Sequence, residues 1–218
     1  MEPFRVLTAV AVPLDQANVD TDQIIPAEFL RKPRSAGFGR FLFHRRRFAA
    51  DGSLDASFPL NREEYRGARI LVADVNFGCG SSRESAVWAL TDPVDDPTAP
   101  GRFRAIVAPS FGDIFYGNAA KNGLLCVRLP AAACAELRAG LRERPGASLT
   151  VDLTEQRVVD DGGRTYIFEI DPFRKECLLR GVDDITLSLG HAEAIRAWET
   201  KQGCERPWAV LPPERTER

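Results

Sequence analysis

Apolar and polar positions alternate in blocks along the middle of the chain. Short, almost continuous apolar runs are typical of strands that are buried on both faces of a sheet, and such runs occur at 68–75, 103–110 and 124–129. Helices are predicted between and after them, at 84–90, 111–123 and 130–144. Asn122-Gly123 is a plausible left-handed end for the second helix, and Pro130 is suited to the start of the third. Cys134, Leu137 and Leu141 fall on one face of that third helix, so Cys134 is predicted to be a core residue.

The two ends of the chain lack the alternating strands and helices of the middle. Residues 4–14 are rich in β-formers, and residues 148–170 alternate and turn at Asp161-Gly162-Gly163, which predicts a hairpin or small meander. A short helix at 171–181 should stop at Gly181. A final helix at 191–203 is expected to turn Ala194, Ile195 and Trp198 inward. Interleaved strands and helices between these ends predict an α/β fold with a mixed sheet.

Three segments read as loops. Asn18, Asp20 and Asp22 form a polar cluster that is typical of a loop or a helix cap, and Pro26 is suited to begin a helical turn. Residues 31–47, "RKPRSAGFGRFLFHRRR", predict an exposed, mobile loop that is either a solvated basic face or a surface facing an anion or a partner. The acidic, proline-rich residues 91–102 predict a surface insertion.

Composition narrows the functional classes. Acids outnumber bases by 31 to 29, which gives no general attraction for nucleic acid or an anionic membrane. No apolar run approaches the roughly 18 residues of a membrane span, and no basic leader is evident, so the cytoplasm is expected. Five separated cysteines and two histidines do not suggest the ligand set of a metal site built from this chain alone.

The stretch "NFGCGSSRESAVWAL" at 76–90 carries the candidate chemistry. A glycine turn between a strand and a helix forms an anion site, because the first N–H groups of the helix are unpaired and carry partial positive charge. Ser81 or Ser82 could cap the helix, and Arg83 could grip a carboxylate with two hydrogen bonds. A plain serine cap with a surface arginine is the other interpretation of these residues. A serine acting as a base would need such positive charge and N–H donors nearby.

Three motifs in order, "NVDTDQIIPAEFL", "NFGCGSSRE" and "APSFGDIFYGNAAKNGLL", closely resemble the small subunits of bacterial 3-isopropylmalate dehydratases. These enzymes are the leucine-pathway isomerases of the aconitase superfamily. The resemblance spans about residues 6–201 and implies a swivelling β/β/α domain of the aconitase last-domain type. The domain is expected over residues 1–204, followed by a mobile tail at 205–218.

The resemblance also implies roles for individual residues. Ser81 is similar to the catalytic base that removes and returns a proton on carbon, while Ser82 and Arg83 resemble substrate-carboxylate binders. Thr21 and Asp22 match the loop that faces the hydroxyl chemistry, with Asp22 expected to be catalytic and Thr21 to bind substrate. Asp20 is expected to be structural.

Leu30 and Arg31 lie in a segment that resembles the selector of the substrate's side group. The resemblance further implies a separate large subunit that carries a 4Fe–4S cluster, which activates the hydroxyl group of a small dicarboxylate substrate. Cys79 is interpreted as a packing residue of the turn.

Two features depart from the family pattern. Ser85 stands where the family usually has histidine after "SSRE", and the insertion near 92–103 lengthens a loop. Two alternatives therefore stay open beside the isomerase: a related hydro-lyase acting on another substituted malate, and a non-catalytic module that keeps only the anion-binding turn.

Overall fold

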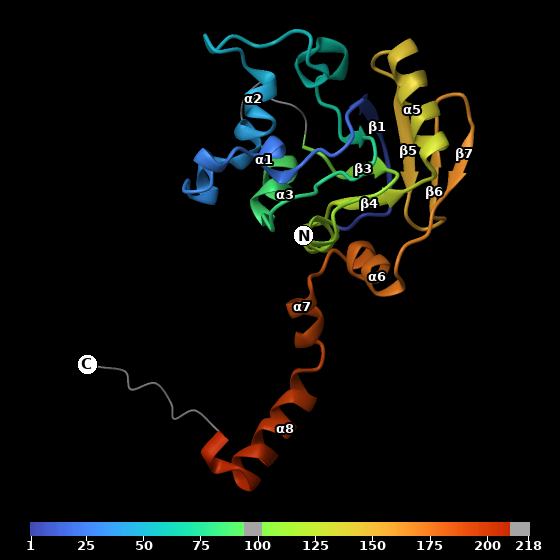
Figure 1. Cartoon of the computed structure of the whole chain (residues 1–218). Coiled ribbons are helices and arrows are strands. Elements are labelled where there is room, and N and C mark those ends of the chain that lie inside the picture. The colour runs from blue at the N-terminus through green and yellow to red at the C-terminus, as the bar shows by residue number, and fades with distance from the viewer. Residues whose placement is uncertain (94–101, 210–218) are drawn as a thin grey trace. The chain divides into compact units, whose positions relative to one another are not determined.

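The structure is a computed structural model that describes residues 1–93 and 102–209. The chain divides into two compact units, Met1–Val182 and Asp183–Arg218. The first unit contains a seven-stranded sheet in the order β4-β3-β2-β1-β5-β6-β7 (Figure 1). Most of the predicted insertion at 91–102, and residues 210–218 of the predicted tail, lie outside the described residues.

The sheet is mixed, as the sequence predicted. Four neighbouring strands are parallel, namely β1 (Val6–Pro13), β2 (Ile70–Val72), β3 (Ala105–Ala108) and β4 (Leu125–Arg128). Three more continue it as an antiparallel meander, namely β5 (Ser148–Asp152), β6 (Arg157–Val159) and β7 (Thr165–Ile167). The meander was expected from alternation, which marks strands with one face exposed.

Helices surround this sheet in the first unit (Figure 1). The α-helices are α1 (Thr21–Ile24), α2 (His44–Arg47), α3 (Glu84–Thr91), α4 (Asp113–Lys121), α5 (Ala131–Glu143) and α6 (Pro172–Arg180). Short 3-10 helices cover Ala27–Phe29, Arg34–Ala36, Phe38–Phe41, Pro59–Asn61 and Glu63–Tyr65. Gly123 and Gly181 have positive φ angles just after α4 and α6, which confirms both predicted helix ends.

The parallel strands separate two cores. Ile70 and Val72 belong to a core that includes Cys134 and Leu137 of α5, which confirms Cys134 as a core residue. Leu71, between them, belongs to the opposite core, together with residues of α3 and α4. Since side chains alternate between the faces of a strand, two covered faces require a continuous apolar run. This requirement explains why these strands were recognisable in the sequence.

The expectation of an exposed loop at 31–47 holds for residues 31–35 and was wrong for the apolar residues that follow. Phe38, Leu42 and Phe43 are buried in the core on the α3 side of the sheet, and Arg47 is only 1% exposed. The Phe38 ring packs edge-on against the ring of Trp88 in α3, with 5.6 Å between the centroids. Aromatic residues among the arginines anchor the segment, because each buried ring removes a large apolar surface from water.

The second unit contains α7 (Asp184–Leu189), α8 (Ala192–Glu205) and a 3-10 helix at Pro207–Ala209. The prediction that Ala194, Ile195 and Trp198 face inward was wrong, because all three are exposed and Trp198 is 62% exposed. The apolar spacing of α8 therefore has no covering partner within the described part of the second unit. The domain boundary at residue 204 stays a prediction. No helix in the described ranges is long and apolar enough to cross a membrane.

Candidate active site

The glycine-serine turn lies at the carboxyl ends of the parallel strands, between two other loops. The Gly78 N–H donates to the Val19 carbonyl at 2.7 Å, and the Phe77 N–H donates to the Ser110 carbonyl at 3.0 Å. Isolated bridges pair Cys79 with Asp20 and Phe77 with Phe111. The turn thus continues the parallel pairing beyond the strands. Open α/β sheets bind ligands at this edge.

Two glycines make this close approach feasible. Gly78 has a φ of +75°, and a Cβ at this position would lie 2.3 Å from the Phe115 ring of α4. Gly80 has a φ of +86°, and its Cβ would lie 3.3 Å from the Asp20 Cβ. Both positions require a residue that tolerates positive φ, and Gly78 also has no room for a side chain.

Thr21 fastens the α1 loop to the serine turn. Its N–H donates to the Cys79 carbonyl at 2.9 Å, and its hydroxyl donates to the Ser81 carbonyl at 3.0 Å. The Thr21 side chain is buried and its proton is used in this bond. Thr21 therefore holds Ser81 in position, and its predicted contact with substrate stays a prediction.

The two serines do not cap the helix. Arg83 is the N-cap residue of α3, and no side chain makes a capping hydrogen bond there, so the expected serine cap was wrong. Ser81 and Ser82 are exposed, and neither hydroxyl has a hydrogen-bond partner among the described residues. Both hydroxyls are therefore available to a ligand at the start of α3. Ser85, in contrast, is buried in the first turn of α3.

Asp22 and Arg83 join the first two motifs directly. The Arg83 Nη1 donates to the Asp22 Oδ1 at 2.6 Å, and the Ala27 N–H donates to the same oxygen at 2.9 Å. The hydrogen bond from Arg83 lowers the pKa of Asp22, burial acts in the opposite direction, and the Ala27 N–H and the charge of Arg45 lower it further. Asp22 is therefore ionised at neutral pH.

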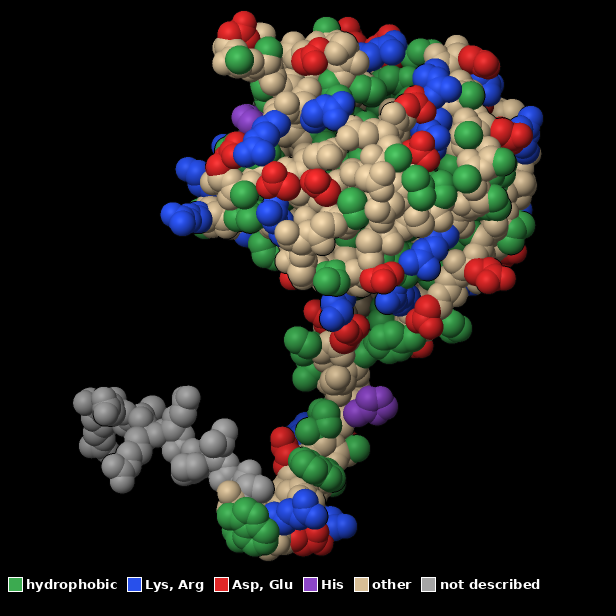
Figure 2. Space-filling model, viewed as in Figure 1, with side chains coloured by type: hydrophobic (Ala, Val, Ile, Leu, Met, Phe, Trp, Pro, Cys, Tyr) green, Lys and Arg blue, Asp and Glu red, His purple; other side chains and the backbone are tan. Residues whose placement is uncertain are grey.

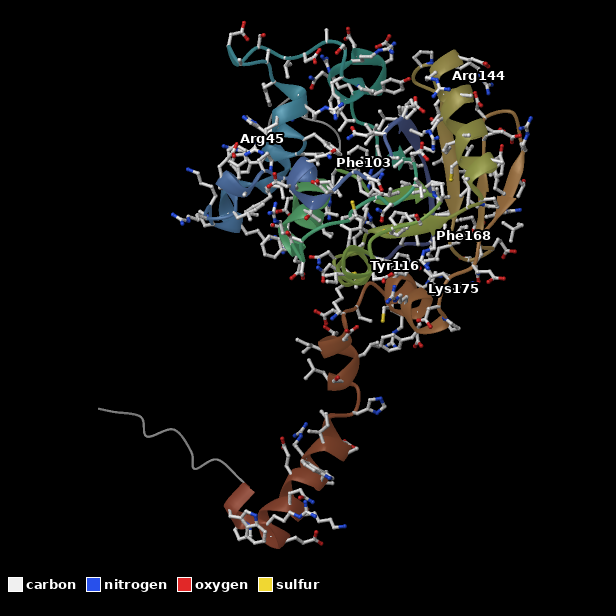
Figure 3. All side chains as sticks on the ribbon, in the orientation of Figure 1. Arg45, Phe103, Tyr116, Arg144, Phe168 and Lys175 are labelled. Atoms are coloured by element: carbon white, nitrogen blue, oxygen red, sulfur yellow. The ribbon has the colours of Figure 1, made fainter. Side chains whose placement is uncertain are left out.

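Arg45 completes the group around Asp22 and was not singled out from the sequence. Its Nη1 lies 3.2 Å from the Asp22 Oδ2, and its Nη2 donates to Glu28. Figure 3 shows Arg45 on α2, and Figure 2 shows acidic and basic side chains gathered on the face that carries α1 and α2. Arg45 stands in a run of three arginines, and nothing in such a run indicates which of them meets the site.

The remaining candidates are Asp20, Leu30 and Arg31. Asp20 accepts the Gln23 N–H at 2.7 Å and caps α1, the structural role that was expected. Leu30 and Arg31 are exposed just beyond the 3-10 helix that Ala27 begins, and no hydrogen bond or ion pair joins either to Ser81 or Arg83 among the described residues. Their predicted role in side-group selection stays a prediction.

The described residues do not fit a metal cluster. No group of three His, Cys, Asp or Glu side chains that could hold a metal ion occurs in residues 1–93 and 102–209. Burial raises the pKa of the Cys79 thiol, with the charge of Asp20 adding to the effect, so this cysteine is protonated at neutral pH.

Family models and sequence relatives both match this chain over most of its length. A family model described as the aconitase C-terminal domain matches residues 1–132, and a second, described as LeuD_N, matches residues 135–172. The 3-isopropylmalate dehydratase small subunit of Magnetococcus marinus is 47% identical over 97% of this chain and 100% of its own length. The protein of the same name from Geobacillus kaustophilus is 49% identical over 95% of this chain and 100% of its own length.

A solved structure is also similar. The crystal structure of 3-isopropylmalate dehydratase (leuD) from Methanocaldococcus jannaschii has a TM-score of 0.58 and 25% sequence identity with this chain. The similarity covers 91% of this chain and 99% of that one. The mixed sheet and its helices are thus of the expected aconitase C-terminal type.

Replacing Gly78 by alanine tests the close approach of the turn to α4. A left-handed alanine costs about 1–2 kcal/mol, and the overlap with the Phe115 ring should add about 1–3 kcal/mol. The control is Gly67→Ala, because Gly67 has a φ of +72° and no atom within 4 Å of its Cβ position. Denaturant unfolding should show a larger loss of unfolding free energy for Gly78→Ala. Equal losses would contradict the packing account.

The pKa of Asp22 can be followed by NMR of its carboxyl carbon. Arg83→Gln should raise this pKa, because the hydrogen bond from Arg83 is the main cause that lowers it. Since a lowered pKa in the folded state gives stability that is lost as pH falls through that pKa, Arg83→Gln should also weaken the loss of stability in acid. Asp51, whose pKa is lowered by hydrogen bonds from Ser53, serves as the control and should not change. An unchanged Asp22 pKa would contradict the pairing.

Proposed function

The chain belongs to the family of 3-isopropylmalate dehydratase small subunits, and from this premise we propose that it is the small subunit of a heteromeric hydro-lyase in leucine biosynthesis. The enzyme interconverts 2-isopropylmalate and 3-isopropylmalate through isopropylmaleate. Its partner is a large subunit, its substrate is a small dicarboxylate, and it acts in the cytoplasm. Similarity over the full length of the relatives supports this proposal.

The observation that carries the proposal is the Asp22–Arg83 ion pair, next in sequence to two serine hydroxyls that have no hydrogen-bond partner in the described part of the chain. The pair unites a carboxylate, a guanidinium and two hydroxyls from segments about sixty residues apart. A guanidinium with free N–H groups next to hydroxyl donors is complementary to a carboxylate. A simple helix start would not need Asp22 and Arg83 in contact.

In the proposed reaction, Arg83 and Ser82 hold one carboxylate of the substrate. Arg83 uses Nη1 on Asp22 and has no other partner among the described residues, so other N–H groups of its fork are available to the ligand. Bidentate pairing would fix the substrate's orientation as well as bind it. Asp22 in turn fixes the plane of the Arg83 guanidinium.

Ser81 is the proposed base. Ser81 acts as its alkoxide: Oγ takes the proton from the carbon next to the hydroxyl-bearing carbon, the C–H electron pair forms the C=C bond, and the C–O bond breaks. The hydroxide that leaves takes a proton from solvent and departs as water, which leaves isopropylmaleate. Return of the proton and water to exchanged carbons gives the isomer. An alkoxide at Ser81 needs positive charge close by, which Arg83 and the N-terminal end of α3 supply.

We place the 4Fe–4S cluster on the large subunit, because the described residues of this chain offer no ligand set for it. When bound there, the cluster would supply Lewis-acid activation of the substrate hydroxyl. The exposed side chains of this chain then contribute the proton transfer and the carboxylate contacts. The site is therefore shared between two subunits.

Anaerobic reconstitution with the large subunit from the same genome tests the assignment. Hydration of isopropylmaleate that requires both subunits is the expected result. Activity on another substituted malate alone would identify a related hydro-lyase instead. A failure to form a complex would favour the non-catalytic module.

Ser81→Ala in the reconstituted complex tests the base. Loss of a general base lowers kcat by about 10²–10⁴-fold, whereas Ser82→Ala should mainly raise KM because it removes a substrate contact. Both variants should fold normally, since neither hydroxyl has a hydrogen-bond partner among the described residues, and their binding to the large subunit is measured as the control. Wild-type turnover by Ser81→Ala would refute its assignment as the base.

A further inference from the structure

Four charged side chains of alternating sign run across the candidate site. Arg83 pairs with Asp22 at 2.6 Å, Asp22 pairs with Arg45 at 3.2 Å, and Arg45 pairs with Glu28. They come from four places in the chain: the start of α3, α1, α2 and the 3-10 helix at Ala27–Phe29. Asp22 therefore pairs with two arginines, and Arg45 pairs with two acidic side chains.

The two oxygens of Asp22 have different partners. Oδ1 accepts from Arg83 and from the Ala27 N–H, whereas Oδ2 is close to Arg45 alone among the described side chains. Two guanidinium groups on one carboxylate also repel each other, so each is held less firmly than a guanidinium that is alone with the carboxylate. The positive potential that a ligand meets at Arg83 therefore depends on Arg45 as well as on Asp22.

We propose that Arg45 is a positioning residue that controls the strength of the ion pair between Asp22 and Arg83. Glu28 acts in the opposite direction, because it competes with Asp22 for Arg45. This inference rests on the proposed function, because Arg83 is taken to bind a substrate carboxylate. Asp22, Arg83 and Arg45 together carry a net charge of +1, and Glu28 brings the row to zero. Removing Arg45 lowers the positive charge at the carboxylate site, and removing Glu28 raises it.

The neighbouring arginines do not share this role. Arg46 donates to Gln16 at 2.6 Å and lies over the Phe58 ring. Arg47 is buried, donates to Asn61 at 3.0 Å and lies over the Phe48 ring. The three consecutive arginines of α2 thus have three different sets of partners. Arg46→Gln is therefore a matched control for Arg45→Gln.

The test compares KM and kcat of the reconstituted complex at low salt. Arg45→Gln should raise KM about two- to fivefold, the size expected for one exposed ion pair, with kcat changed less. Arg45→Lys should recover part of this loss because it keeps the charge. Glu28→Gln should lower KM, since it frees Arg45 to pair fully with Asp22, and Arg46→Gln should leave KM unchanged. The effects should shrink at high salt.

The affinity between the subunits is measured in parallel. Weaker subunit binding by Arg45→Gln with an unchanged KM would show that Arg45 docks the partner, and would overturn the inference. Equal shifts of KM in Arg45→Gln and Arg46→Gln would do the same. Opposite shifts of KM in Arg45→Gln and Glu28→Gln support it, because a merely structural loss would not change sign.

A readout without activity separates this inference from the proposed function. In the free subunit, the Arg83 side-chain N–H signal reports its bond with Asp22 by NMR. Arg45→Gln and Glu28→Gln should move that signal in opposite directions even if the complex has no activity on isopropylmaleate. No movement in either variant would overturn the role of Arg45 while leaving the proposed function intact.

Discussion

The ion pair between Asp22 and Arg83 is the contact on which the candidate site depends. It joins the loop after β1 to the turn after β2, whose strands lie side by side in the parallel part of the sheet. The same two loops are fastened by the bond from Thr21 to Ser81 and by the bond from Gly78 to Val19. Without these contacts, Arg83 would be an ordinary surface arginine beside two serines.

The position of the glycine-serine turn is linked to the core of the fold through Gly78. Its backbone packs directly against the Phe115 ring of α4, and this contact limits where the turn can lie relative to the sheet. Because α4 and the parallel strands share one apolar core, the geometry of the exposed hydroxyls is set by buried residues. The exposed turn that is proposed to be catalytic is thereby held on a rigid support, as precise chemistry requires.

Much of this arrangement was predictable from the sequence, for identifiable reasons. Strands covered on both faces leave continuous apolar runs, and Gly123 and Gly181 mark helix ends because they adopt positive φ. The ordered motifs indicated the family, and hence a site around Ser81, Arg83 and Asp22. The roles proposed for these residues rest on that resemblance and on their geometry.

Other features depended on tertiary contacts that no local pattern records. The segment 31–47 has the composition of a loop, yet Phe38 and Phe43 are buried because α3 and the core receive their rings. Trp198 lies on an apolar stripe of α8 and remains exposed, because spacing predicts a face and not its partner. Arg45 could not be distinguished from Arg46, since only the folded chain brings one of them to Asp22.

The most direct measurement is a double-mutant cycle on Asp22 and Arg83, with Asp22→Asn, Arg83→Gln and the double variant compared by kcat/KM in the reconstituted complex. If the two side chains act as one unit, the double variant should lose less than the sum of the single losses, with a coupling energy of about 1–3 kcal/mol. Strictly additive losses would mean that the ion pair does not organise the site, and would contradict the account.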